Sequence, residues 1–181
     1  LHFLCGGKLD RYPTIPIFIN GAAAPMPTTK RTVALGRAVG QFVKSLNLEN
    51  ERVLILGTGG SAKAVSYVFR KLNIEHFFVT REDSRFHYTY ADLNNNTMKA
   101  FQIIVNTTPL GMFPKVNECP NIPYEFLTHK NLCFDLIYNP AQTLFLEKSK
   151  DAGAFIHNGF RMLRLQAEKS WEIWNEPAYA Q

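Results

Sequence analysis

The residues with the clearest chemical meaning are small ones that follow a short apolar run. Gly57, Gly59 and Ala62 fit G-x-G-x-x-G/A, the turn between the first strand and first helix of a dinucleotide-binding unit. There the first glycine permits a tight bend, the second lets the backbone approach a pyrophosphate, and the third small residue lets the helix pack on the strand. The helix N-terminus would face the phosphates. We therefore expect cofactor contacts at Gly57, Thr58, Gly59, Gly60, Ser61 and Ala62; the alternative is a turn without a ligand.

The residues on either side of this glycine turn (residues 57–62) fit the same interpretation. Residues 53–56 are all aliphatic, which is typical of a strand buried on both faces of a parallel sheet. After the turn, Val65, Val68, Phe69 and Leu72 recur at the spacing of one helical face. A strand before the turn and an amphipathic helix after it favour the cofactor interpretation.

Two arginines after the next expected strand, residues 75–80, bear on which cofactor is bound. In NAD-binding units an acidic residue usually ends this strand and binds the ribose hydroxyls. Here the strand leads into Thr80 and Arg81, and Arg85 follows shortly after. A guanidinium can hold a 2′-phosphate through charge-assisted, often bidentate hydrogen bonds. The pattern favours NADP over NAD; the alternative is an ordinary charged surface turn.

Three further clusters follow expected strands: Asn-Thr-Thr-Pro at 106–109, Leu-Ile-Tyr-Asn-Pro at 136–140, and Asn-Gly at 158–159. Each alone has a simple structural explanation, namely a strand terminator, a half-buried tyrosine and a helix-start turn. Ligands of open α/β sheets bind beyond the carboxyl ends of the strands. Clusters at three successive strand ends therefore predict the rim of one pocket.

Strands and helices alternate from residue 52 onward. Further strands are expected at 101–106, 132–138 and 154–157, and helices at 143–152 and from 159 to about 174. The asparagines at 94–96 are expected to break regular structure, and residues 113–124 to form a loop. This alternation predicts an α/β fold: a Rossmann-like, doubly wound parallel sheet with helices on both faces.

The expected domain comprises residues 32–181 and begins with a connecting helix at 32–46. Residues 1–31 contain prolines at 13, 16, 25 and 27, which confine any strand there to an edge or an irregular path. We expect these residues to form an irregular N-terminal segment.

Composition limits the classes of partner. The net charge of +5 and the pI of about 9.2 favour anionic partners, but the basic residues are scattered, so nucleic-acid binding is not expected. No apolar run has the length of a membrane span. Cys5, Cys119 and Cys133 form no C-x-x-C pair, which argues against disulfides and zinc and for a reducing, cytoplasmic compartment. The histidines show no metal-ligand spacing.

Taken together, these stretches resemble the shikimate dehydrogenase family, especially its C-terminal NADP-binding half. The matching segments are VLILGTGGSAKAV, VTREDSR, IVNTTPLGM, DLIYNP and NGFRMLRLQAEKSWEIW, in the family's order and across about residues 50–175. NTTPLGM, DLIYNP and NGxxMLxxQA in combination are highly specific. The resemblance implies NADP-dependent interconversion of 3-dehydroshikimate and shikimate, a step of aromatic amino-acid biosynthesis.

The resemblance also implies roles for individual residues. Residues 57–62 would hold the pyrophosphate, and Thr80, Arg81 and Arg85 the adenosine 2′-phosphate. Asn106, Thr107 and Thr108 would line the cofactor groove. Leu136, Gly159 and Met162 would lie by the nicotinamide, while Tyr138 and Gln166 would contact the shikimate carboxylate or hydroxyls. A homodimer is compatible with the sequence.

The chain departs from the family in residues 1–50, which lack its Ser-x-Ser, N-V-T-x-P-x-K and N-T-D motifs. These motifs carry the substrate site and the catalytic Lys and Asp, so no catalytic residue is assigned and little activity is expected from this chain alone. We expect a truncated chain, or one whose first thirty residues are foreign to the family. Two alternatives remain: a non-catalytic NADP-binding module, and an NAD-preferring quinate/shikimate dehydrogenase.

Overall fold

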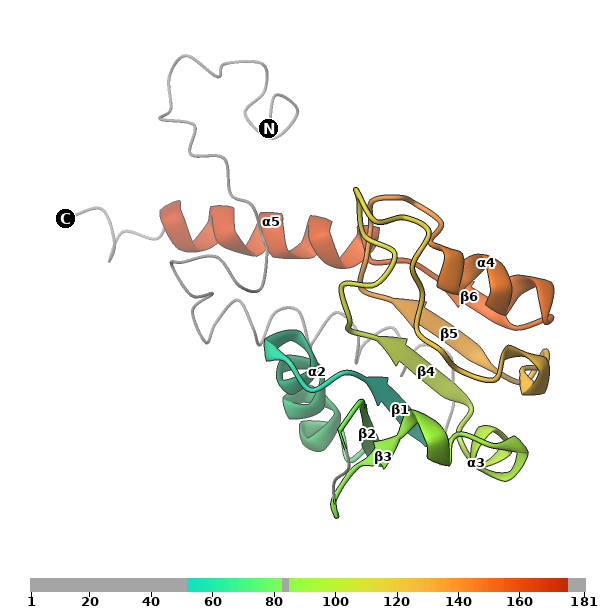
Figure 1. Ribbon diagram of the computed structural model, residues 1–181. Helices are drawn as coiled ribbons and strands as arrows, with labels where there is room; N and C mark the ends of the chain where they lie inside the picture. The colour runs from blue at the N-terminus through green and yellow to red at the C-terminus, as the bar shows by residue number, and fades with distance from the viewer. Residues whose placement is uncertain (1–51, 83–84, 176–181) are drawn as a thin grey trace.

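The computed structural model describes residues 52–82 and 85–175. Parallel strands form one six-stranded sheet in the order β3-β2-β1-β4-β5-β6 (Figure 1). The strands are β1 (Val53–Leu56), β2 (His76–Thr80), β3 (Tyr88–Thr89), β4 (Ile103–Asn106), β5 (Leu132–Asp135) and β6 (Phe155–His157). The first strand lies in the middle and the order reverses beside it, as in a doubly wound sheet. The predicted fold class is confirmed.

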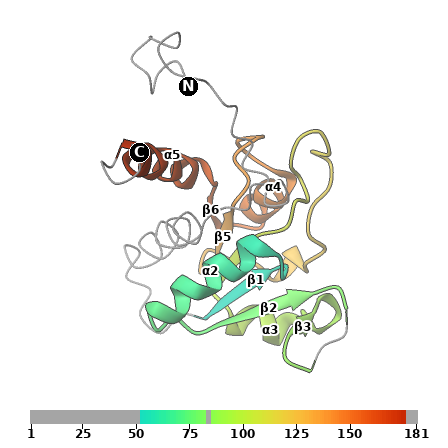
Figure 2. The same cartoon turned by 90° about the vertical axis from the view of Figure 1, so that its left-hand side faces the viewer.

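Helices cover both faces of this sheet. They are α2 (Gly60–Lys71), α3 (Asn95–Ala100), α4 (Leu144–Asp151) and α5 (Phe160–Asn175), with 3-10 turns η2 (Tyr90–Asp92) and η3 (Tyr124–Phe126). Because side chains alternate along a strand, β1 sends Val53 and Ile55 to the α2 face and Leu54 and Leu56 to the face of α3 and α4. Figure 2 shows α2 lying across the sheet on its own side.

The helix α3 was not expected from the sequence, and the prediction of a break at residues 94–96 is wrong. Asn94 does not end the regular structure; it begins a helix. Its side-chain oxygen accepts hydrogen bonds from the backbone N–H groups of Asn96 (2.9 Å) and Thr97 (3.2 Å), which is the N-cap role that asparagine favours. The expected connecting helix at 32–46 and the segment 1–31 lie outside the described residues.

The strands end together, because their register is level across the centre of the sheet. Leu56 pairs with Asn106, and Asn106 pairs with Asp135. The arrowheads of β1, β4 and β5 accordingly point to the same side in Figure 1, where α2 and α5 begin. We call this side the carboxyl edge of the sheet and the opposite side, which contains Arg52 and Asn131, the amino edge. Within the described part of the chain, every helix is too short or too polar to cross a membrane.

Candidate functional site

The bend after β1 requires a glycine for two reasons. Gly57 has a φ of +102°, a backbone conformation that side chains rarely allow. A Cβ atom there would also lie 3.1 Å from Thr107 Oγ1 and 3.2 Å from Thr108 Cγ2. The Gly57 N–H donates to the Val79 carbonyl at 2.9 Å. The glycine turn is thus tightly packed against the ends of both neighbouring strands, β2 and β4.

The N-terminus of α2 beyond this bend is open. Gly59 is the N-cap residue, no side chain caps the helix, and its first turn contains no acidic residue. A Cβ atom at Gly59 or Gly60 would meet nothing within 4 Å. The first backbone hydrogen bond of the helix runs from the Lys63 N–H to the Gly59 carbonyl at 3.0 Å, so earlier N–H groups have no intrahelical acceptor. This is the geometry of an anion site at a helix N-terminus.

Ala62 occupies the third small position of the motif. Its side chain has no exposed surface and belongs to the apolar cluster between α2 and the sheet, with Val53 and Val105. The packing role expected for this residue matches its position.

Thr80 and Arg81 lie beside the glycine turn, at the end of β2, because Leu56 is in register with Val79. The Thr80 hydroxyl accepts a hydrogen bond from the Glu82 N–H at 3.3 Å. Arg81 and Arg85 are both exposed, and neither forms a salt bridge within residues 52–82 and 85–175. Burial raises the pKa of the Tyr90 hydroxyl, and the charge of Arg81 opposes that shift, so Arg81 lies near η2. Both guanidiniums can receive an anion.

Three residues expected near a nicotinamide lie together next to α2. Leu136 follows β5 and packs against Ala64 of α2 and the buried Met162 of α5. A Cβ atom at Gly159 would overlap the Leu136 carbonyl, and the Gly159 N–H donates to the Ile137 carbonyl at 3.1 Å. Only glycine therefore fits where α5 begins against the loop after β5.

Thr107 and Thr108 line the same edge, next to Gly57. The Thr107 hydroxyl donates to the Leu56 carbonyl at 2.6 Å, which ties β4 to the end of β1. Asn106 has a different position from the one expected. It is fully buried, on the α3 and α4 side of the sheet, so its side chain lies below the groove rather than along it.

The partner of Asn106 is Asp135, a residue not expected in the site from the sequence. Asn106 Nδ2 donates to Asp135 Oδ1 at 3.1 Å, and the same oxygen accepts from the Ile137 N–H at 3.0 Å. The Thr143 hydroxyl donates to Asp135 Oδ2 at 2.6 Å. Burial raises the pKa of the Asp135 carboxyl to about 6, although these three hydrogen bonds oppose the shift. The available signal was a polar residue at the same last position of two buried strand segments, IIVN and LCFD.

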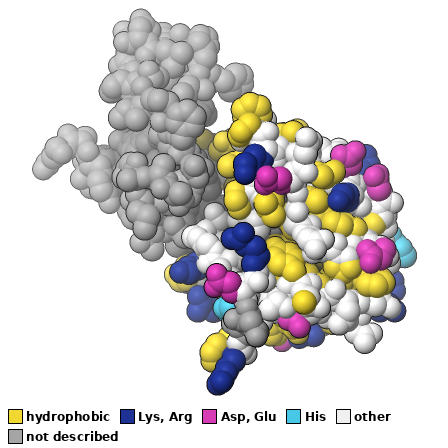
Figure 3. Space-filling view, in the orientation of Figure 1, with side chains coloured by type: hydrophobic (Ala, Val, Ile, Leu, Met, Phe, Trp, Pro, Cys, Tyr) yellow, Lys and Arg dark blue, Asp and Glu magenta, His cyan; other side chains and the backbone are white. Residues whose placement is uncertain are grey.

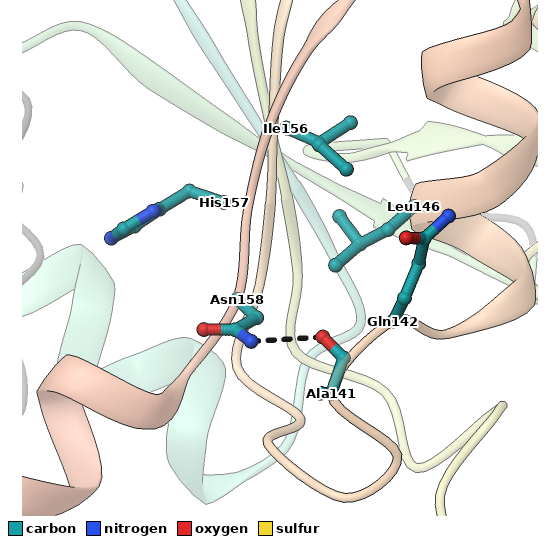
Figure 4. A pocket seen from close by; sticks show the side chains of 6 residues that line it. All are labelled: Ala141, Gln142, Leu146, Ile156, His157 and Asn158. Atoms are coloured by element: carbon teal, nitrogen blue, oxygen red, sulfur yellow. Dashed lines mark hydrogen bonds between the residues drawn. The ribbon is translucent and has the colours of Figure 1, made fainter.

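The two residues expected to contact substrate are not placed together by the described side chains. Tyr138 lies on the loop after β5 and is exposed. Gln166 belongs to α5, but its side chain is outside what the structure describes. A hollow of about 210 Å³ lies between the loop before α4 and the end of β6 (Figure 4). Of the residues expected at the pocket rim, it is lined by Asn158 and by neither Tyr138 nor Gly159.

Asn158 connects the two loops at this hollow. Its Nδ2 donates to the Ala141 carbonyl at 2.8 Å, the bond drawn in Figure 4, and its Oδ1 accepts from the Phe160 N–H at 3.2 Å. The side chain of His157 points away from Leu146 and Ile156 in the same view. Asn158 thus stabilises the turn that leads into α5, which is the structural role named as its alternative in the sequence. On the face shown in Figure 3, basic and acidic side chains are interspersed.

Comparison with known proteins identifies the relatives of this site. The NADP(+)-dependent shikimate dehydrogenase of Methanococcus vannielii is 33% identical over 159 residues, which covers 78% of this chain and 54% of the relative. A chorismate mutase/shikimate 5-dehydrogenase fusion protein from Clostridium acetobutylicum superposes with a TM-score of 0.64 and 32% identity, over 78% of this chain and 55% of that one. This chain is a partial shikimate dehydrogenase-like protein. It spans about half the length of the curated relatives it matches.

Two further similarities qualify this family assignment. Quinate dehydrogenase from Corynebacterium glutamicum, solved with NAD, superposes with a TM-score of 0.67 at 20% identity, over 80% of this chain and 56% of that one; it shares the fold. Residues 1–65 match a family model described as the catalytic LigB subunit of aromatic ring-opening dioxygenase. Of that range, residues 52–65 belong to the described structure, as β1 and the first half of α2. That the chain is truncated, or that its first thirty residues are foreign to the shikimate dehydrogenase family, stays a prediction.

Proposed function

We propose that this chain is the NADP-binding part of a shikimate dehydrogenase, an enzyme that moves a hydride between NADP(H) and the 3-dehydroshikimate/shikimate pair. The observation that carries the proposal is the open N-terminus of α2, which lies between the end of β2 and the wall formed by Thr107 and Thr108. The M. vannielii relative is a shikimate dehydrogenase (NADP(+)), which supports the same cofactor.

The described residues fit this cofactor part by part. The N–H groups at the start of α2 would hold the pyrophosphate, and Arg81 and Arg85 the 2′-phosphate. Leu136, Gly159 and Met162 would border the nicotinamide. Bound NADP(H) supplies the hydride donor or acceptor; the contribution of the chain is to fix its orientation relative to a substrate. Tyr138 and Gln166 are the proposed contacts to shikimate.

Cofactor titration of the purified chain tests the proposal. We expect NADPH to bind more tightly than NADH and to raise the melting temperature, because a ligand that binds only the folded state stabilises it. Replacing both arginines (Arg81→Ala with Arg85→Ala) should weaken NADPH binding by about 10- to 100-fold and leave NADH binding nearly unchanged. Gly59→Val should weaken binding of both cofactors, because its side chain fills the space at the anion site.

A matched control removes two basic residues from the other end of the same helix, as Arg70→Ala with Lys71→Ala. This pair should leave both affinities unchanged. Failure of the wild-type chain to bind either cofactor would contradict the proposal. Tighter binding of NADH than NADPH would instead support the NAD-preferring quinate/shikimate alternative.

A second candidate function is a non-catalytic NADP-binding module. The sequence as given contains neither N-V-T-x-P-x-K nor N-T-D, and the open N-terminus of α2 would serve a binding module equally well. The observation that separates the two is turnover of shikimate with NADP when a separately produced substrate domain of a relative is added. Binding of NADPH without turnover under those conditions would favour the module.

A further inference from the structure

A network of buried hydrogen bonds lies beneath the proposed cofactor groove. Asp135 accepts hydrogen bonds from Asn106, Ile137 and Thr143, as described above. On its other side, Asn106 Oδ1 accepts from both the N–H (3.0 Å) and the hydroxyl (2.7 Å) of Thr108. Asn106 and Asp135 are both fully buried, so neither can bind a ligand directly.

This network of buried hydrogen bonds joins elements that are far apart in sequence. Thr143 is the N-cap residue of α4, Ile137 belongs to the loop after β5, and Thr108 belongs to the loop after β4. The side chain of Thr108 in turn borders Gly57. One amide and one carboxylate therefore fix two loops relative to the glycine turn.

These loops lie on one particular half of the proposed groove. The strand order places β2 and β4 on opposite sides of β1. A dinucleotide whose pyrophosphate lies at the start of α2 has its two nucleosides on those two sides. Arg81 follows β2, which assigns that side to the adenosine 2′-phosphate. The loops after β4 and β5 then face the nicotinamide half.

We propose that Asn106 and Asp135 are positioning residues: a buried tether that holds Thr107 and Thr108 in place for the nicotinamide half of the cofactor. This inference rests on the proposed function. The tether acts through the geometry of the wall and makes no contact with the cofactor. Its loss should therefore weaken binding of the whole dinucleotide while sparing the adenosine half.

The chain contains a matched polar group at the amino edge. Asn131 Oδ1 accepts from the N–H (2.8 Å) and the hydroxyl (3.1 Å) of Thr128, and its Nδ2 donates to the Phe101 carbonyl at 3.2 Å. The same asparagine–threonine pairing thus occurs at both ends of the sheet, but only the pair at the carboxyl edge borders the proposed groove. Asn131→Asp is the control for Asn106→Asp.

The test measures two ligands on each variant at pH 8: NADPH, and adenosine 2′,5′-bisphosphate, which lacks the nicotinamide half. Asn106→Asp removes the donor to Asp135 and places two carboxylates together. We expect it to raise the NADPH dissociation constant about tenfold or more and to leave that of the bisphosphate within about twofold. Adding Asp135→Asn, which restores a donor between the two positions, should recover part of the loss. Asn131→Asp should leave the ratio of the two constants unchanged.

Each outcome bears on a distinct claim. A wild-type chain that binds neither ligand contradicts the proposed function itself. The tether is overturned if the wild type binds both ligands and Asn106→Asp does not change the ratio of the two dissociation constants. It is also overturned if Asn106→Asp changes that ratio no more than Asn131→Asp does. Lack of any recovery in the double variant also overturns it. If circular dichroism shows that Asn106→Asp does not fold, Thr143→Val replaces it and Thr128→Val is its control. Thr143→Val should then weaken NADPH binding about threefold without weakening bisphosphate binding, and equal effects on both ligands would overturn the tether.

Discussion

The two edges of the sheet are built from the same strands and differ in how their polar groups are satisfied. At the amino edge, the Arg52 guanidinium lies over the rings of Phe77 (5.2 Å) and Phe101 (4.7 Å), and its Nε lies 2.9 Å from a Glu75 oxygen. That contact is an ion pair without hydrogen-bond geometry. At the carboxyl edge, the start of α2 meets open space. The side chains of the amino edge contact one another, whereas at the carboxyl edge the first N–H groups of α2 face open space.

The difference between the two edges predicts which substitutions change stability alone and which also change binding. Side chains at the amino edge already contact one another, so substitutions there should change stability alone. At the carboxyl edge the buried tether and the backbone of Gly159 support the exposed donors. Substitutions in that support should change both properties.

The largest effect is expected from Gly159→Ala, which tests how tightly the carboxyl edge is packed. The added methyl group would overlap the Leu136 carbonyl, so α5 or the loop after β5 must move, at a cost of about 3 kcal/mol or more. Gly153→Ala, at the amino end of β6, is the matched change. Its Cβ would be 3.9 Å from the nearest atom, and its φ of +91° implies a loss of only about 1 kcal/mol. Urea denaturation of both variants measures the difference; equal losses would remove the distinction between the edges.

The next effect is a dependence of stability on pH that arises at the carboxyl edge. The pKa of Asp135 is raised from 3.8 to about 6, so the folded state holds this proton more tightly than the unfolded state. Its contribution to the free energy of unfolding is therefore full below about pH 4 and is lost as the pH rises through 6, by up to about 3 kcal/mol.

Unfolding at a series of pH values measures this contribution. Asp135→Asn should flatten the curve between pH 4 and 7 relative to the wild type. Asn131→Ala, at the amino edge, should lower stability by the same amount at every pH. If the difference in free energy of unfolding between the wild type and Asp135→Asn does not change with pH in that interval, the pH dependence does not arise from Asp135.

The smallest effect is expected from Arg52→Met, which keeps the apolar stem between the two rings and removes the charge. The ion pair is partly exposed, at 36% for Arg52 and 57% for Glu75, and such pairs contribute little. With the cation–π contacts included, the loss should be about 1 kcal/mol. NADPH affinity should not change. A change in affinity comparable to that of Asn106→Asp would mean that the edges are not independent.

The sequence predicted the fold well where a pattern has one physical explanation. The aliphatic residues before Gly57 become a central strand, and Val65, Val68 and Phe69 become the buried face of α2. Leu72, the fourth residue of the expected face, is the C-cap residue and only half-buried. Gly57 also has the positive φ that a tight bend requires. In each case local pattern and burial agree.

Prediction from sequence failed where a polar residue had two possible partners. Asn94 begins a helix because its side chain accepts backbone N–H groups of the following turn, whereas runs of asparagine are more typical of loops. Asn106 faces inward because side chains alternate along β4, and Asp135, at the same register position of β5, is its buried partner. That pairing depends on which strands are neighbours, and no local window contains this information. The contacts of Arg81 and Arg85 with a cofactor remain predictions.

The alternation of side chains at the end of β4 has a consequence for sequence change in relatives of this chain. Asn106 points to the α3 and α4 layer, while the hydroxyl of Thr107, one residue later, bonds to the Leu56 backbone carbonyl at the end of β1. Inserting or deleting a single residue in β4 would exchange these two environments and place an amide where a small hydroxyl is needed. Sequence variation in the Asn-Thr-Thr segment should therefore differ between adjacent positions: the residue at 106 must suit the buried interior, and the residue at 107 must suit the carboxyl edge beside Gly57.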